Sequence, residues 1–300
     1  MDRAGNNDET DGTTGPAGWR VALLIAGAVL VGALSGFGLG AAFPGGGDAV
    51  VSRELPPLRE AQLPRIAVSG RTGADAPLVV LDPGHGGFDP GASSTGGARE
   101  KDIALALATA VRDVLLDLGG VRVAMTREDD RFLPLEERPR IAEALGADAF
   151  VSIHADSAPV PEAQGANVYV LSARASDREA QALARIANES ASGLDLPDGA
   201  DDVAHVLADL MRRETALASV GLATAIDEES QGAMPRHAPF RRSANFVVLR
   251  SPEMPSVLFE AGYLTNPDDA QRLADPATRQ IVAEALARAI LTDLLAAQPR

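Results

Sequence analysis

The stretch "VVLDPGHGGFDPGASSTGG", residues 79–97, decides the architecture, because an apolar run ends there in a glycine-rich loop. The apolar residues up to Leu81, followed by Asp82 and Pro83, are typical of a short buried strand. The loop sets His85 just beyond the end of this strand. In open α/β sheets, ligands bind in the crevice outside the carboxyl ends of the strands. The stretch therefore predicts a strand that carries a histidine to a binding site.

The rest of the chain alternates between strand and helix patterns. Apolar runs predict strands at 78–82, 121–125, 149–155, 167–171, 244–249 and 256–260. Helical spacing of apolar residues predicts helices within 100–120, 135–147, 176–190, 203–228 and 277–295. This alternation predicts an α/β domain with an open, mainly parallel twisted sheet flanked by helices.

Composition and charge limit the function classes. The 300 residues are 46% hydrophobic and 23% charged, which suits a globular protein with a sizeable core. The net charge is −15, so nucleic acid is not an expected partner, because its phosphates would be repelled. The chain has no cysteine, which excludes disulfides and a thiolate metal site.

The first residues predict how the protein is placed in the cell. Residues 1–20 are polar and are expected to form a disordered cytoplasmic tail. Residues 21–43 carry no charge and are long enough for a transmembrane anchor in the inner membrane. Arg20 precedes this segment and no Lys or Arg follows until Arg53, so the rest of the chain is expected in the periplasm. The alternative is a cleaved signal sequence, which would export the protein.

A linker and one catalytic domain are expected to follow. Residues 44–76 are rich in Gly and Pro, which disfavours regular structure, although 65–70 has the pattern of a short edge strand. The α/β pattern then occupies residues 77–298.

Four residues gather at one predicted edge of the sheet. His85, His154 and Glu260 lie at or just past strand ends, and Glu100 begins a helix. Each alone has an ordinary interpretation, such as a surface histidine or a first-turn acid. Together, two imidazoles and a carboxylate suit a catalytic Zn²⁺, and the remaining acid could accept a proton from water.

Six motifs carry a resemblance to a known family. The chain resembles the zinc-dependent N-acetylmuramoyl-L-alanine amidases, the Amidase_3 family, over about residues 77–296. The motifs that carry it, in chain order, are "LDPGHGGFDPGA", "EKD", "TREDD", "LEERPRIA", "SIHAD" and "PSVLFEAGYLTNP".

The resemblance implies a reaction and a role for each residue. It implies that His85, Glu100 and His154 bind Zn²⁺ and that Glu260 is the catalytic acid–base. The implied substrate is peptidoglycan, cut at the amide between the lactyl group of N-acetylmuramic acid and L-alanine of the stem peptide. The implied role is cell-wall remodelling and daughter-cell separation. The chain departs from the family at Asp156, where asparagine is usual, and in "EAGY" instead of "ELGF", which concerns substrate contacts and not the metal.

Other functions are weighed against this one. A wall-binding protein that keeps the fold without metal is an alternative, although all four site residues are present. A phosphate-binding loop would need a lysine after the glycines, and none lies between Gly84 and Gly97. Ser152 is a poor nucleophile candidate, because no separate His–Asp pair is visible for it.

The remaining polar residues are expected to be mostly structural. His205 is expected on a solvated helix face. His237 lies in "MPRHAPFRRS", which is expected to be a solvated basic loop, with contact to an acidic stem peptide as the alternative. Arg127 and Arg138 are expected in structural ion pairs. Asp89 is expected in an Asx turn, with support of a metal ligand as the alternative.

Residues 193–230 are longer than an α/β crossover needs. They resemble the insert of division-associated amidases, in which a helix covers the metal site until a LytM-type activator protein draws it away. The carboxylates proposed to occupy the open metal position are those of Asp198, Asp201 and Asp202. The alternative is an ordinary pair of surface helices.

Overall fold

A computed structural model describes residues 64, 66–70, 76–158, 160, 162–189 and 202–297, with side chains in the last range from residue 211 onward. Residues 61–300 form one compact unit. The expected tail and membrane segment, and most of the linker, lie outside the described residues. Within the described ranges, no helix has the length and apolarity needed to cross a membrane.

One sheet runs through the domain in the strand order β1-β3-β2-β4-β7-β5-β6. Its strands are Val68–Ser69 (β1), Leu78–Pro83 (β2), Arg122–Met125 (β3), Ala149–His154 (β4), Ala166–Leu171 (β5), Arg236–Ala244 (β6) and Ser256–Glu260 (β7). The pairings β2–β3, β2–β4, β4–β7 and β5–β6 are parallel, whereas β1–β3 and β5–β7 are antiparallel. The prediction of a mainly parallel sheet, with an edge strand near residue 68, is confirmed.

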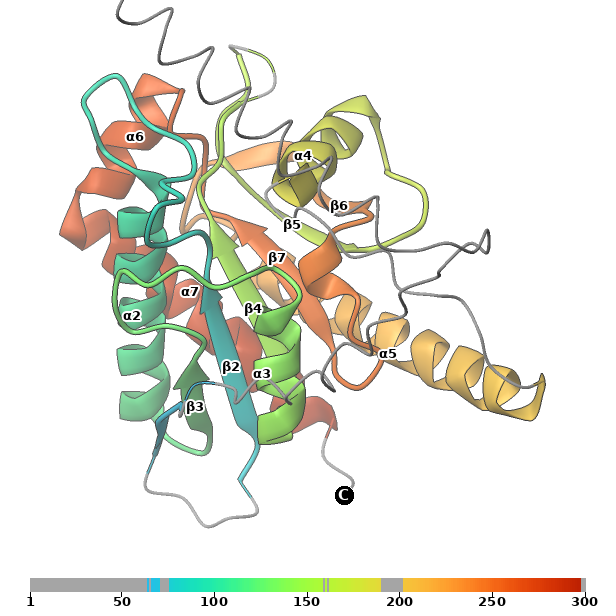
Figure 1. Cartoon of the computed structure of the whole chain (residues 1–300). Coiled ribbons are helices and arrows are strands. Elements are labelled where there is room, and N and C mark those ends of the chain that lie inside the picture. The colour runs from blue at the N-terminus through green and yellow to red at the C-terminus, as the bar shows by residue number, and fades with distance from the viewer. Residues whose placement is uncertain are drawn as a thin grey trace, which may run out of the picture. The chain divides into compact units, whose positions relative to one another are not determined.

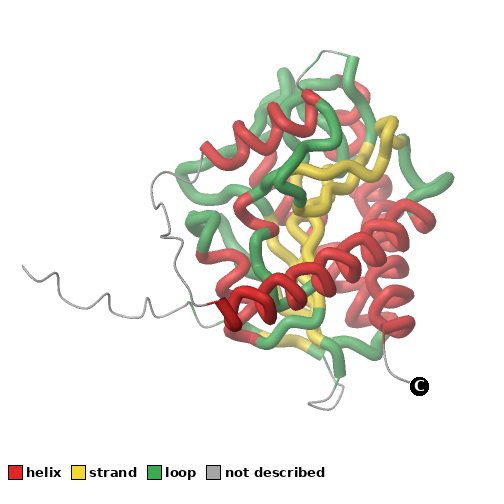
Figure 2. Tube along the Cα trace, turned by 90° about the vertical axis from the view of Figure 1, so that its right-hand side faces the viewer, coloured by secondary structure: helices red, strands yellow, loops and turns green. Residues whose placement is uncertain are grey.

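Helices cover both faces of the sheet, as Figure 2 shows with the strands between two layers of helix. They are Glu100–Leu118 (α2), Glu137–Leu145 (α3), Arg178–Glu189 (α4), Asp202–Glu229 (α5), Pro267–Ala274 (α6) and Pro276–Ala297 (α7), with a short 3₁₀ helix at Val247–Leu249 (η1). In Figure 1, α3 lies in front of the sheet and α7 behind it.

Strand alternation explains the two layers. Val79 and Leu81 of β2 belong to the core cluster that includes residues of α2, α5 and α7, while Leu78 and Val80 belong to the cluster that includes residues of α3, α4 and η1. Every residue of β2 and β4 is buried, as expected for parallel strands covered on both faces. The center of the sheet is therefore a rigid support for residues at its ends.

The segment around residue 240 differs from the prediction. We expected a strand at 244–249, but β6 ends at Ala244 and the chain turns into η1. The strand instead covers Arg236–Ala244, where a basic loop was expected. β6 is an edge strand, so one of its sides has no partner strand in the sheet. Edge strands tolerate charged side chains and proline, which explains the arginines and Pro239 in β6. The apolar run after it forms η1 and fills the core without pairing in the sheet. Periodicity alone does not distinguish this from a buried strand.

A buried ion pair fastens β2 to the loop that follows it. The guanidinium of Arg138 in α3 lies 2.9 Å from the carboxylate of Asp82, and both side chains are almost fully buried. Asp82 also accepts hydrogen bonds from Thr126 and Ser152. Burial alone would raise the pKa of Asp82, but Arg138 and the hydroxyls outweigh it and lower the pKa. The ionised pair therefore stabilises the fold above the ordinary carboxyl pKa of 3.8 and loses this contribution as the pH falls through the lowered pKa.

We predict that Asp82→Ala lowers the free energy of unfolding by about 3–5 kcal/mol, because it leaves a buried guanidinium without its counter-charge. Urea denaturation measures the change. The matched control is Arg185→Ala, which removes the ion pair between Arg185 and Glu189. Their side chains are 68% and 62% exposed, respectively. This control should cost less than about 1 kcal/mol. Equal losses in the two variants would contradict a special role for the buried pair.

Candidate metal centre and active site

Three parallel strands bring the predicted residues to one edge of the sheet. β2 ends just before His85, β4 ends at His154 and β7 ends at Glu260. His154 and Glu260 are direct neighbours in the register of β4 and β7. Glu100 is the first residue of α2, which packs on β2 and β4. Strand direction and helix packing thus assemble residues separated by long stretches of sequence.

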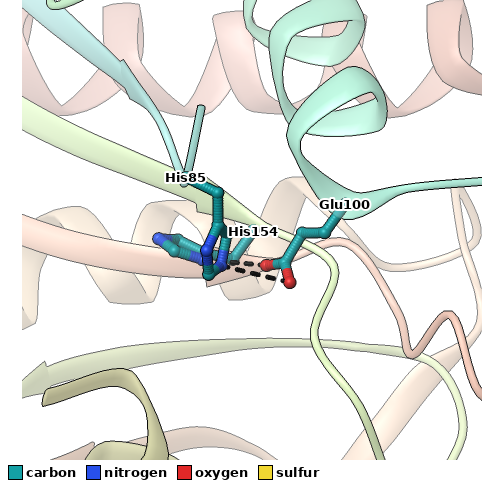
Figure 3. A group of neighbouring side chains, drawn as sticks. All are labelled: His85, Glu100 and His154. Atoms are coloured by element: carbon teal, nitrogen blue, oxygen red, sulfur yellow. Dashed lines mark hydrogen bonds and ion pairs between the residues drawn. The ribbon is translucent and has the colours of Figure 1, made fainter. Parts of the chain in front are cut away.

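His85, Glu100 and His154 form a tight cluster, shown in Figure 3. Their candidate ligand atoms all lie within 4.8 Å of one another. The carboxylate of Glu100 reaches both rings, with Oε2 at 3.1 Å from Nε2 of His85 and Oε1 at 2.9 Å from Nδ1 of His154. Two imidazole nitrogens and one carboxylate are a common protein donor set for catalytic zinc. The residues therefore fit the metal that the sequence resemblance implied.

Neighbouring groups hold the three side chains in place. Nδ1 of His85 lies 2.8 Å from a carboxylate oxygen of Asp89, which fixes the ring and leaves Nε2 toward the cluster. The other oxygen of Asp89 accepts from the backbone N–H of Gly91, so Asp89 forms the expected Asx turn and also supports a ligand. The backbone N–H groups of Ala92 and Ala155 donate to Glu100.

The cluster carries the electrostatics of a cation site. Burial alone would lower the pKa of His85, but Glu100 and Asp89 raise it to about 10. Burial would raise the pKa of Glu100, but the two imidazoles lower it well below its usual value. Glu100 is therefore ionised in a buried position, where a positive charge is favourable.

Two glycines leave room for the cluster. A Cβ at Gly84 would lie 2.3 Å from the ring of His154. A Cβ at Gly91 would lie 2.5 Å from Oε2 of Glu100 and 2.7 Å from the ring of His85. His85 itself has a φ of 58°, a left-handed conformation that is uncommon outside glycine and is often found at functional sites. The glycine-rich loop is thus shaped around the ligands.

We predict that Gly91→Ala weakens zinc binding by about ten- to a hundredfold, because the methyl group displaces Glu100 and His85. Competition with a chromophoric chelator measures the affinity. Gly97→Ala is the matched control: Gly97 also has a positive φ, of 85°, but a Cβ there meets nothing within 4 Å. If both variants lose the same affinity, backbone strain and not the contact is responsible.

Glu260 lies beside the cluster in a buried position. Its Oε2 accepts a hydrogen bond of 3.1 Å from the backbone N–H of Asp156. Burial, Asp156 and Glu100 raise the pKa of Glu260 well above its usual value. Burial and Glu100 raise the pKa of Asp156 to about 7. Glu260 and Asp156 therefore hold protons more readily than ordinary surface acids, in contrast to Glu100.

The other predicted residues have structural contacts. Ser152 donates to Asp82 and is fully buried, as expected for a residue that is not a nucleophile. Arg127 donates to the carbonyl oxygens of Pro83 and Gly84 and supports the loop. His237 lies in β6 with Nε2 at 3.0 Å from Glu179, so its place in a loop was a wrong prediction.

His205 lies in α5, and its side chain is outside the described part of the chain. The steric role of Gly91 was not predicted from the sequence, because neither its positive φ nor the side chains close to it can be recognised before the structure is known.

Buried imidazole and carboxylate ligands at the carboxyl edge of an open α/β sheet are typical of metal-dependent hydrolases. Comparison with known proteins narrows this class. Residues 79–292 match Amidase_3, the family described as N-acetylmuramoyl-L-alanine amidase. The chain belongs to this family.

Named relatives agree with the match. The chain is 39% identical over 218 residues to N-acetylmuramoyl-L-alanine amidase AmiA of Escherichia coli K12, covering 72% of this chain and 75% of the relative. It is 38% identical over 223 residues to AmiC of Neisseria meningitidis serogroup B, covering 74% and 53%. Among solved structures, the amidase AmiC2 of Nostoc punctiforme is 34% identical with a TM-score of 0.52, covering 74% of this chain and 99% of that structure.

Proposed function

We propose that this chain hydrolyses the amide between the lactyl group of N-acetylmuramic acid and L-alanine of the peptidoglycan stem peptide, with Zn²⁺ held by His85, Glu100 and His154. The observation that carries the proposal is the buried cluster whose ligand atoms lie within 4.8 Å of one another. Family membership supplies the substrate class.

The residues of the chain divide the work. Zinc, when bound here, supplies Lewis acidity that activates water and polarises the scissile carbonyl. Glu260 accepts a proton from the attacking water and returns it to the leaving amine of L-alanine. The N–H of Asp156 orients the Glu260 carboxylate for this role. Asp89 holds the His85 ring, and burial of Glu100 keeps bulk water from its carboxylate.

Metal removal tests this proposal. The full chain, incubated with dye-labelled sacculi, should release soluble dye, stop after treatment with a chelator, and recover when Zn²⁺ is restored. Zinc content measured on the same samples should follow activity. A chain that binds sacculi without releasing stem peptides, with or without zinc, is instead the metal-free wall-binding protein considered above.

We also propose a place for the enzyme in the cell. The uncharged segment 21–43 would anchor it in the inner membrane with the catalytic domain in the periplasm, or would export it if cleaved. Its role would be cell-wall remodelling and daughter-cell separation. Fractionation of cells that express the tagged chain tests the location. The role is tested by deleting the protein from cells, which should then remain joined in chains after division.

Control of the enzyme by residues 193–230 is part of the proposal, with a LytM-type protein as activator. The described half of α5 packs in the core, where Leu222, Ala223 and Ile226 are buried. Ser219 accepts from the N–H of Ser256 at the start of β7, the end opposite Glu260. Residues 202–210 continue α5 beyond Ser219, on the side away from Glu260. Any cover over the site would therefore come from residues 193–201, which include Asp198 and Asp201.

We predict that Leu207→Ala together with Leu210→Ala raises basal activity on purified sacculi without an activator, because these residues would hold the cover in place. Leu217→Ala, at a 74% exposed site in the described half of α5, is the control and should not change the rate. Unchanged or lower activity of the double variant, with an unchanged melting temperature, would contradict restraint by this segment.

A further inference from the structure

A pair of stacked phenylalanines lies on the loop that carries His85. The rings of Phe88 and Phe132 have centroids 4.1 Å apart and an interplanar angle of 29°. Phe88 is 81% exposed, more than any other large apolar side chain in the described part of the chain. Exposing an aromatic ring to water is unfavourable, so such a ring is a candidate contact site.

The loop holds this pair rigidly. The N–H of Gly87 donates to Asp130 at 2.9 Å, and the carbonyl oxygen of Gly87 accepts from Lys101 at 2.7 Å. Lys101 also bonds Asp130, which ties the two loops together. A Cβ at Gly87 would lie 2.8 Å from the backbone nitrogen of Phe132, so only glycine lets the loops approach this closely. The backbone next to the exposed ring is thus held in place by hydrogen bonds.

The pair also lies next to the catalytic cleft. Phe88 follows His85 by three residues, a span of at most about 10–11 Å. Phe132 lines the same small cavity as His85 and His154. Phe132 thus lies in the wall of a cavity shared with two candidate metal ligands, and the exposed ring of Phe88 stacks on Phe132.

We propose that Phe88, backed by Phe132, is a stacking platform for a pyranose ring of the peptidoglycan glycan strand. The inference rests on the proposed function, since in that substrate the sugar is joined through its lactyl group to the scissile amide. One face of a pyranose presents C–H groups, which match the negative face of an aromatic ring. The platform would orient the glycan while the amide lies at the metal centre, which makes Phe88 a determinant of specificity for sugar-bearing substrates.

Paired substrates test the proposal in the full chain. One is a disaccharide carrying a stem peptide on its lactyl group, and the other is the same peptide with a D-lactoyl group and no sugar. The ratio of their kcat/KM values should fall about three- to tenfold in Phe88→Ala and in Phe88→Leu, which keeps an apolar side chain but removes the ring. Phe88→Trp should recover the ratio relative to Phe88→Leu. Leu217→Ala, a distant exposed site on α5, is the control.

Equal losses on both substrates, or a ratio that no variant changes, would overturn the platform.

A direct binding measurement separates this failure from failure of the proposed function. The chain has one tryptophan, Trp19, so Phe88→Trp in a Trp19→Phe background gives a fluorescence signal from the loop alone. Added chitotetraose should shift this emission. If the wild-type chain cleaves neither substrate but the emission of the Trp variant still shifts, the amidase proposal is refuted and the platform is kept. If the wild-type chain cleaves the substrates but neither the emission nor the kcat/KM ratio changes, only the platform is refuted.

Discussion

Replacing Glu260 with alanine is expected to lower amide hydrolysis by about two to four orders of magnitude while zinc stays bound. Glu260 is the neighbour of His154 in the sheet register but is not one of the three clustered ligands. Removing it therefore takes away the proton acceptor and leaves the metal site. Rates on sacculi and zinc content, measured on the same sample, check both parts of the prediction.

Glu260→Gln provides the control for structure. The amide oxygen can still accept the N–H of Asp156, so the cleft keeps its shape while proton transfer is lost. Both variants should show a similar loss of rate. Loss of zinc from either would mean that Glu260 is a ligand and that its assigned role is wrong.

His85→Ala and His154→Ala are each expected to lose zinc and, with it, activity. Each imidazole is one of only three protein donors in the cluster, and the remaining two would hold the metal poorly. Atomic emission of the purified variants measures bound zinc, and circular dichroism checks that the fold is kept.

His205→Ala and His237→Ala are the matched controls and should retain zinc. His237 bonds Glu179 and packs against Tyr263, and it is not one of the three residues of the cluster. If His237→Ala alone emptied the site, the ligand set proposed here would be incorrect.

Much of this site could be predicted from sequence because it depends on strand direction. Short apolar runs located β2, β4 and β7, and parallel strands place their ends at one edge. His85, His154 and Glu260 follow from that geometry, and Glu100 follows from the start of α2. The motif order then gave the family, which the comparison confirmed.

Features that depend on tertiary packing could not be predicted in this way. The run after Ala244 was expected to be a strand because its apolar pattern fits one, yet it turns into η1, which is buried in the core without a partner strand. The edge strand β6 was read as a loop because charged residues and Pro239 obscure its pattern. Both errors concern the edge of the sheet, where pairing places fewer demands on sequence.

The close approach of side chains was equally hidden. Gly91 looks like any loop glycine until Glu100 and His85 are placed 2.5 and 2.7 Å from its missing Cβ. No role was assigned to Phe88 from the sequence, and the structure leaves it 81% exposed. Such contacts join segments distant in sequence, and local propensity contains no information about them.

The most direct test of the central claim is mass spectrometry of the products released from purified sacculi by the full chain loaded with zinc. We expect free stem peptides that begin with L-alanine, and glycan strands whose N-acetylmuramic acid keeps its lactyl group with a free carboxylate. Products cut within the glycan or within the stem peptide, or an intact sacculus, would contradict this claim.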